Sequence, residues 1–244
     1  MKTPIIAAAA LGALVATGAL AQDVVRIGTE GAYAPYNYIN DAGQVDGFER
    51  ELGDAICERA GLTCEWVMND WDSIIPNLTS GNYDVIMAAM TITDEREQVV
   101  DFSDAYYPPT ASAYAADAED ANYESGVVSA QTATIQAAYI AESGATLLEF
   151  ANPEEAVQAV RDGEADAVFA DYDYLVPLVE DSDGALMFVG DEVPIGGGIA
   201  AAFRKGDDTL RGQFDAVIEA MKADGSLNEM LARWFGDESR VPAF

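Results

Sequence analysis

Residues 84–96 read Asp-Val-Ile-Met-Ala-Ala-Met-Thr-Ile-Thr-Asp-Glu-Arg. Residues 85–89 are an apolar run that predicts a buried strand, and polar residues follow it closely. The chain before this run alternates between strand and helix patterns. Strands are predicted at 24–28 and 64–67. Each is followed by a helical repeat, the first at Phe48, Leu52 and Ile56 and the second at Ile74, Ile75 and Leu78. This βαβαβ order predicts a parallel sheet with helices on its faces.

The same alternation restarts in the second half of the chain. The expected elements are a strand at 127–128, a helix from Ile135, a strand at 146–150, a helix from Pro153 and a strand at 167–170. This unit is flanked by two segments that disfavour helix, at 106–110 and 191–198. The second segment is followed by a strand at 199–203 and two helices. We therefore expect two lobes joined by two adjacent strands that act as a hinge.

The charge of the chain excludes several kinds of function. Its 12 Lys and Arg stand against 43 Asp and Glu, and it has no His, for a formal net charge of −31. Binding to nucleic acid or to an anionic membrane needs clustered cations that this chain lacks. Without His there is no Ser-His-Asp or Cys-His system and no imidazole ligand for zinc or copper, so we expect no cofactor and no metal.

The N-terminus indicates secretion. A positive start at Met1-Lys2, an Ala-rich apolar run and the small-x-small sequence Ala19-Leu20-Ala21 predict a signal peptide over residues 1–21. The alternative, a transmembrane helix, is disfavoured because the run is short and polar residues follow it. The mature protein is therefore expected to be soluble and periplasmic.

The two cysteines, Cys57 and Cys64, flank a helix-ending turn at Ala60-Gly61. In an oxidising compartment such a pair is expected to form a disulfide between the end of one helix and the start of the next strand. A loop this short is worth about 2.5 kcal/mol of stability on the chain-entropy model. We expect the bridge to be structural.

An ordered set of segments resembles one protein family. The segments are 26–36 (RIGTEGAYAPY), 47–52 (GFEREL), 70–78 (DWDSIIPNL), 84–96 (DVIMAAMTITDER), 101–103 (DFS) and 166–171 (DAVFAD). Together they resemble the polar amino-acid periplasmic binding proteins of ABC importers, which include binders of lysine/arginine/ornithine, histidine, glutamine and opines. The resemblance covers essentially the whole mature chain.

The resemblance implies the two-lobed, type II periplasmic-binding-protein fold, in the α/β class. Each lobe would be a mostly parallel sheet with flanking helices, and two strands would form the hinge. We expect residues 22–108 and 196–244 in lobe 1 and residues 109–195 in lobe 2.

Four residues are expected to hold the amino-acid backbone of a ligand, and one of them, Thr91, adds a hydroxyl or backbone N–H to the carboxylate contact. Arg96 matches the family motif Thr-x-x-x-x-Arg that begins at Thr91, and its guanidinium suits a carboxylate. From spacing alone, Arg96 reads more readily as a surface ion pair. Asp171 follows a lobe 2 strand and by resemblance meets the ligand's ammonium, although it is also placed to cap a helix.

Thr134 lies between a strand and a helix, where the family grips the same carboxylate and where an ordinary helix cap fits equally well. The usual Gly-Ser/Thr-Thr pattern is replaced by Thr132-Ala133 before Thr134.

Other residues are assigned to the specificity pocket by resemblance. Glu30 would face a cationic side-chain end, with Glu49 assisting more distantly. Tyr33 and Trp71 would flank the ligand's side chain, because a flat guanidinium stacks well on aromatic rings. For Glu30 a solvated acid, and for Trp71 core packing, are the plainer alternatives.

Ala88, Ala89 and Met90 complete the expected pocket. The two alanines stand where common basic amino-acid binders carry serines, and Thr-Glu-Gly and Met-Ala-Ala-Met bring the chain closer to the opine-binding branch. An opine carries an additional carboxylate on its amine, which Asp171 would repel. We therefore favour a free cationic amino acid, with arginine before lysine and ornithine.

The predicted function is capture of this ligand by a monomer that contacts an ABC transporter permease transiently. Alternatives are a binder of glutamine or histidine, an enzyme like cyclohexadienyl dehydratase, to which the resemblance extends, and a sensory receptor acting through a separate membrane partner.

Overall fold

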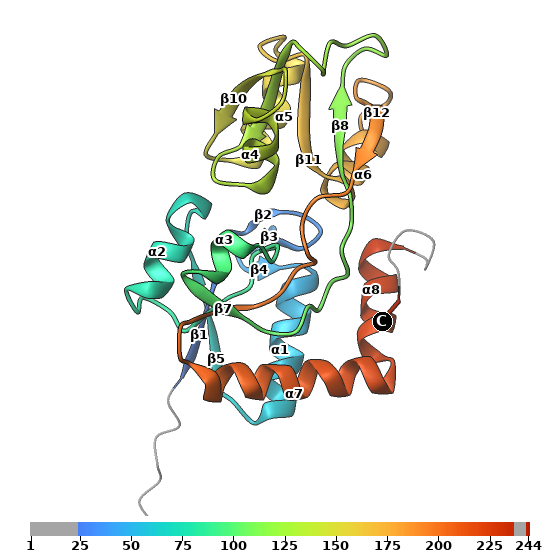
Figure 1. The fold of residues 1–244 in the computed structure, drawn as a ribbon. Helices are drawn as coiled ribbons and strands as arrows, with labels where there is room; N and C mark the ends of the chain where they lie inside the picture. Colours follow the sequence, from blue (N-terminus) through green and yellow to red (C-terminus); the bar gives the residue numbers. More distant parts are fainter. Residues whose placement is uncertain (1–23, 237–242) are drawn as a thin grey trace, which may run out of the picture.

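The computed structural model describes residues 24–236 and 243–244. The predicted signal peptide, residues 1–21, lies outside the described residues. Figure 1 shows two lobes, one above the other, linked by two extended segments. Over the described part of the chain, no helix combines the length and apolar character needed to cross a bilayer.

The first lobe is built on a five-stranded sheet. Its strands are β1 (Val25–Thr29), β5 (Cys64–Met68), β6 (Val85–Ile86), β7 (Val100–Phe102) and β13 (Ala202–Arg204). They lie in the order β5-β1-β6-β13-β7. The pairs β1–β5 and β1–β6 are parallel, as predicted, whereas β13 is antiparallel to both β6 and β7. The antiparallel strand is the one on which the chain returns from the second lobe.

Helices of the first lobe cover this sheet. They are α1 (Phe48–Ala60), a 3-10 turn (Trp71–Ser73), α2 (Ile74–Thr79), α3 (Asp94–Glu97), α7 (Asp208–Asp224) and α8 (Ser226–Phe235). In α1, Phe48, Leu52 and Ile56 are fully buried because a spacing of four places them on one face. The helix ends at Ala60 and is capped by Gly61, whose backbone adopts the left-handed conformation with φ 68°.

A small antiparallel sheet follows β1 and was not predicted. It consists of β2 (Ala32–Tyr33), β3 (Asn37–Ile39) and β4 (Val45–Asp46). Strands of two or three residues are too short to show an alternating pattern. This sheet carries Tyr33 and Asn37 beside the site described below.

The second lobe repeats the arrangement of the first. Its strands are β8 (Ser112–Ala116), β9 (Val127–Gln131), β10 (Thr146–Phe150), β11 (Ala167–Asp171) and β12 (Met187–Val193), and its helices are α4 (Ile135–Ala141), α5 (Pro153–Arg161) and α6 (Tyr172–Glu180). The strand order is β10-β9-β11-β8-β12. Strand β9 pairs in parallel with β10 and β11, while β8 is antiparallel to β11 and β12.

Several predicted segments differ in extent from the structure. Strand β6 ends at Ile86 rather than at residue 89, and the backbone is left-handed at Ala89, where φ is 50°. The regular part of the predicted strand 199–203 begins only at Ala202. Strand β12 extends to Val193, inside the predicted break at 191–198, because its residues pair with β8 despite a register shift.

The two segments that connect the lobes pair with each other. Ile199 forms isolated bridges with Tyr107 and with Thr91. The Ile199 amide donates to the Tyr107 carbonyl at 3.0 Å, and the Tyr106 amide donates to the Ile199 carbonyl at 2.9 Å. Gly198 allows this approach, since a Cβ there would lie 2.9 Å from the Tyr107 oxygen and its φ is +92°. The predicted two-strand hinge is confirmed (Figure 1).

The predicted disulfide between Cys57 and Cys64 is formed. It links the last turn of α1 to the first residue of β5. The bridge therefore joins a helix and a strand that are consecutive in the chain.

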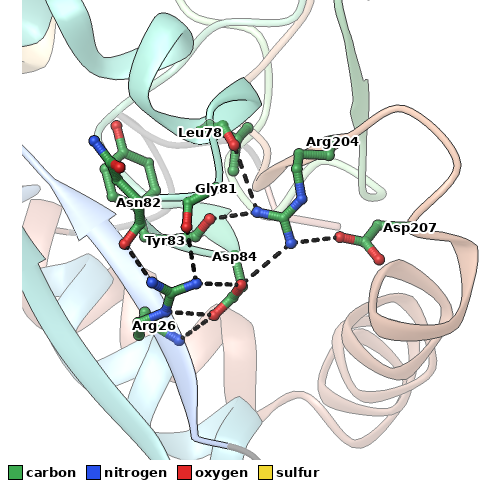
Figure 2. Close-up of polar contacts among 8 residues, drawn as sticks. All are labelled: Arg26, Leu78, Gly81, Asn82, Tyr83, Asp84, Arg204 and Asp207. Atoms are coloured by element: carbon green, nitrogen blue, oxygen red, sulfur yellow. Dashed lines mark hydrogen bonds and ion pairs between the residues drawn. The ribbon is translucent and has the colours of Figure 1, made fainter.

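A group of charged side chains ties three neighbouring strands of the first sheet together (Figure 2). The Asp84 carboxylate accepts from Arg26 Nε at 3.0 Å and from Arg204 Nη2 at 3.2 Å. Arg26 lies in β1, Asp84 directly precedes β6, and Arg204 ends β13. Burial raises the pKa of Asp84, but hydrogen bonds from the two arginines outweigh it and the net pKa is lowered.

Candidate functional site

A cavity lies between the lobes, at the carboxyl ends of the central strands, where α/β sheets place ligands. It is lined by Glu30, Tyr33, Trp71, Ala88, Ala89, Thr91, Arg96, Gln131, Thr134, Ile135, Gln136 and Asp171. Its volume is about 20 Å³, because side chains of the two lobes meet across it. Nine of the eleven predicted ligand-binding residues line it, all but Glu49 and Met90.

Arg96 comes from the short helix α3, which Thr93 caps by accepting the Arg96 amide at 3.1 Å. Both guanidinium hydrogen bonds found in the described residues end on carbonyl oxygens: Nη1 donates to Thr91 at 2.8 Å and Nη2 to Ala133 at 3.4 Å. The guanidinium also lies 5.2 Å from the centre of the Trp71 ring. Burial lowers the pKa of Arg96 to about 10, against the opposing effect of the Asp171 carboxylate.

Asp171 ends β11 and is held by hydrogen bonds from both lobes. Tyr33 donates its hydroxyl to Oδ2 at 2.7 Å, and Gln136 donates Nε2 to Oδ1 at 2.9 Å. Although Asp171 precedes α6, its side chain makes no cap hydrogen bond to that helix. Burial raises the pKa of Asp171 to about 6, with a further contribution from Asp173 and opposition from Tyr33, Arg96 and Gln136.

Glu30 directly follows β1 and reaches across to the second lobe. Gln131 donates Nε2 to Glu30 Oε1 at 2.6 Å and also to the Ala151 carbonyl at 3.1 Å. Burial raises the pKa of Glu30 to about 7, and Asp70 adds to the shift while Gln131 opposes it. Glu30 is therefore not a solvated surface acid.

Thr134 has the role of a helix cap. Its hydroxyl accepts the Ala137 amide at 3.1 Å and donates to the Gln131 carbonyl at 2.6 Å. Since a hydroxyl has one donor and two acceptor positions, one acceptor position remains beyond these contacts. An anion would therefore meet backbone N–H groups here rather than the side-chain proton.

The two predicted aromatic flanks do not stack on each other. Tyr33 stacks on Tyr174 of α6, with ring centres 4.1 Å apart and planes 6° from parallel. Trp71 is 8% exposed and contacts Arg96. The Trp71 indole N–H is buried and has no acceptor among the described residues.

Glu49 and Met90 are placed away from the cavity. Met90 is fully buried and lines an adjoining cavity of about 730 Å³, which shares Trp71, Arg96 and Thr134 with the first. Glu49 is fully buried in the first lobe.

Gln131, Ile135 and Gln136 line the cavity but were not predicted. Gln131 ends β9, so the rule that strand ends face the ligand crevice could have found it. Gln136 could not be found this way, because its position in α4 is set by helix packing. Across the described residues, no group of His, Cys, Asp or Glu is arranged to hold a metal ion.

Comparisons with known proteins place this geometry in a family. The family model described as "Bacterial extracellular solute-binding proteins, family 3" matches residues 25–237. The chain is 33% identical to the L-arginine-binding protein of Pseudomonas aeruginosa, over 96% of each chain. It is 31% identical to the octopine-binding periplasmic protein of Rhizobium meliloti, over 96% of this chain and 98% of that one.

A solved structure is also similar. It is a periplasmic His/Glu/Gln/Arg/opine family-binding protein from Silicibacter pomeroyi in complex with lysine, with 68% identity and a TM-score of 0.87, covering 88% of this chain and 98% of that one. The predicted type II periplasmic-binding-protein fold is confirmed. The chain belongs to the bacterial extracellular solute-binding proteins, family 3.

Proposed function

We propose that this protein captures one amino acid with a cationic side chain and delivers it to the permease of an ABC transporter. The main support for this proposal is the set of charged groups that line the cavity, which are the guanidinium of Arg96 and the carboxylates of Glu30 and Asp171. Free arginine, lysine and ornithine carry the complementary set, one carboxylate and two cations. No other charged side chain lines this cavity in the described residues.

The titration of these groups supports the same conclusion. Burial raises the pKa of Glu30 to about 7 and that of Asp171 to about 6, and it lowers the pKa of Arg96 to about 10. In each case burial disfavours the charged form, so each group gains from a ligand charge of opposite sign. A neutral side chain would leave Glu30 without such a partner.

The roles of the residues follow from their chemistry. Arg96 would bind the α-carboxylate, with Thr91 and the N-terminus of α4 at Thr134 completing the contact. Asp171 would take the α-ammonium in place of the Tyr33 hydroxyl. Glu30 would meet the side-chain cation, and the pocket wall would consist of Tyr33, Trp71, Ala88 and Ala89.

Relatives support a cationic ligand. The similar Silicibacter pomeroyi protein was solved with lysine, and the Pseudomonas aeruginosa relative is named for L-arginine. We place arginine first because the Trp71 ring suits a flat guanidinium, with lysine, ornithine or an opine next. Glutamine or histidine is the alternative.

We propose that the lobes, residues 22–108 with 196–244 and residues 109–195, close on the ligand in the periplasm. A ligand held by Arg96 and Asp171 contacts both lobes, so it stabilises the closed form that a permease recognises. The protein would act as a monomer after removal of residues 1–21.

Calorimetric titration of the mature protein, unfolded and refolded to remove copurified ligand, tests the proposal. Arginine should bind most tightly, and Glu30→Gln should weaken arginine more than its neutral analogue citrulline. Tight binding of an acidic or neutral amino acid, with none of arginine, lysine, ornithine or octopine, would refute a cationic ligand. Mass spectrometry of the released ligand identifies it independently.

We infer that the protein binds without converting its ligand, as its relatives' names describe binding proteins. In the described residues Asp171 is positioned by Tyr33 and Gln136 as an acceptor, which suits an ammonium. Formation of phenylpyruvate from prephenate, lost in Asp171→Ala, would contradict this inference.

A further inference from the structure

Glu49, the second residue of α1, is a fully buried carboxylate with three hydrogen-bond donors from three different segments. Asn37 donates Nδ2 to Oε2 at 2.7 Å, and the Ala89 amide donates to Oε1 at 2.7 Å. The Tyr106 hydroxyl also donates to Oε1. Burial raises the pKa of Glu49, and the three donors oppose this shift because each favours the ionised carboxylate.

Two of these donors connect Glu49 to the lining of the ligand cavity, Ala89 directly and Asn37 through the residue after Glu30. Asn37 uses its other amide atom, Oδ1, to accept the Gly31 amide at 2.7 Å, and Gly31 is the residue after Glu30. Ala89 lines the cavity itself and adopts a left-handed backbone with φ 50°, which costs energy for a residue with a Cβ. Glu49 thus holds the Glu30 turn through one oxygen and the Ala89 turn through the other.

The third donor connects this carboxylate to the hinge. Tyr106 lies in the outgoing connection between the lobes, and its amide donates to Ile199 of the returning connection at 2.9 Å. One carboxylate oxygen of Glu49, Oε1, therefore accepts a hydrogen bond both from Ala89, which lines the cavity, and from Tyr106 of the hinge.

We propose that Glu49 is a positioning residue for ligand selectivity, which sets the Glu30 and Ala89 turns and couples them to the hinge without touching the ligand. The inference rests on the proposed function, because it assumes that Glu30 meets the ligand's cationic end. A carboxylate near a helix N-terminus is also favoured by the helix dipole. Stabilising α1 would not, however, require donors from three other segments.

The hydrogen-bond pattern allows a test by reversal. In Glu49→Gln one oxygen becomes an NH₂ group, which faces the Asn37 NH₂ group and breaks the connection to Gly31. Adding Asn37→Asp supplies an acceptor for that NH₂ group and keeps an acceptor for the Gly31 amide. The double variant therefore restores every hydrogen bond and moves the negative charge from position 49 to its hydrogen-bond partner at position 37.

The first measurement is amide hydrogen exchange in the ligand-free protein. The Gly31 amide should exchange slowly in the parent protein, faster in Glu49→Gln and slowly again in the double variant. This readout is independent of the ligand. It therefore separates failure of this inference from failure of the proposed function, which the titration of the parent protein tests.

The second measurement is the ratio of arginine to citrulline affinity. We expect Glu49→Gln to lower this ratio by about tenfold, the effect of losing one hydrogen bond to a charged group, and the double variant to recover it. Loss of general stability would weaken both ligands equally and leave the ratio unchanged. An unchanged ratio, or a double variant that folds without recovery, would overturn the proposal.

Glu58→Gln is the matched control, because Glu58 lies in the same helix, is exposed and loses the same charge. It should leave the exchange rates and the affinity ratio unchanged. If Glu49→Gln does not fold, the double variant alone tests the proposal. An arginine-to-citrulline affinity ratio in the double variant equal to that of the parent protein supports the proposal, and a lower ratio contradicts it.

Discussion

At the scale of the residue, the site depends on charges that burial makes unfavourable. Glu30 and Asp171 each accept hydrogen bonds from the opposite lobe, and Arg96 bonds to carbonyl oxygens within the described residues. Hydrogen bonds from neutral donors compensate these charges only in part, as the shifted pKa values of the carboxylates indicate. A ligand of complementary charge completes the compensation, so binding and protonation are coupled.

The first prediction concerns pH. Because the pKa of ligand-free Glu30 is about 7 and that of Asp171 about 6, binding arginine at pH 5 must displace a proton from each, and arginine affinity should rise by about 1,000-fold from pH 5 to pH 8. Citrulline depends only on Asp171, with a pKa of about 6, so its affinity should rise by about tenfold. Calorimetry over this range measures both, and equal slopes would contradict a role for Glu30.

The same shift has the opposite effect on ligand-free stability. A carboxylate whose folded pKa is raised from 4.5 to about 7 stabilises the fold below pH 4.5, and this contribution is lost as the pH rises through 7. Glu30→Gln should remove this part of the pH dependence of the melting temperature.

The second prediction concerns Arg96. Arg96→Ala should weaken arginine binding by at least about 100-fold, because the ligand carboxylate loses its charged partner, while Arg96→Lys should lose less. The melting temperature should not fall, since the guanidinium has a desolvation cost. Arg50→Ala is the control, because Arg50 is in an exposed ion pair with Asp54. An Arg96→Ala affinity within threefold of the parent would exclude the assigned role.

At the scale of the element, the carboxyl ends of the strands carry residues of the candidate site, and the starts of the strands carry contacts that stabilise the first lobe. Glu30 follows β1 and Asp171 ends β11, whereas the disulfide joins the start of β5 to α1 and Asp84 precedes β6 (Figure 2). The proposed binding residues and these stabilising contacts therefore lie at opposite ends of the first sheet. Changes at one end should have little effect at the other.

The third prediction uses this separation. Replacing Cys57 and Cys64 together by Ala should lower the free energy of unfolding by about 2.5 kcal/mol, because the unfolded chain loses the constraint of a short loop. Urea denaturation measures this loss. The affinity for arginine at 25 °C should stay the same, and a large fall would show that the bridge also shapes the cavity.

At the scale of the whole molecule, direct contacts between the lobes occupy the positions proposed for the ligand. Tyr33 donates to Asp171 and stacks on Tyr174, and Gln131 donates to Glu30. In the proposed binding mode, the ligand's ammonium replaces the Tyr33 hydroxyl on Asp171. Closure without ligand and closure around ligand therefore use the same carboxylate.

The fourth prediction follows from this competition. Tyr33→Phe removes a hydrogen bond to a charged group, worth about 1.5–3 kcal/mol, so the ligand-free protein should open more often. Small-angle scattering should then give a larger radius of gyration than the compact value of about 17 Å expected for this length. Saturating arginine should return parent and variant to the same value. Identical ligand-free values would mean that this contact does not hold the lobes together.

Much of this protein was accessible from its sequence because the deciding signals are local. The periodicity of Phe48, Leu52 and Ile56 predicted α1, the strand-end position of Asp171 placed it at the crevice, and Glu30 was assigned to the pocket by resemblance. The spacing of Cys57 and Cys64 predicted their disulfide. These features depend on neighbours within one or two elements, where pattern and conformation are directly linked.

Tertiary structure alone decided how the charges are paired. Tyr33 and Asp171 are 138 residues apart, and Glu30 and Gln131 are 101 apart, so no local pattern links them. Glu49 of α1 is fully buried and accepts a hydrogen bond from the Ala89 amide, 40 residues away along the chain. The sequence determined which charges are present, while burial between the lobes determined their partners and pKa values, because desolvation depends on the whole fold.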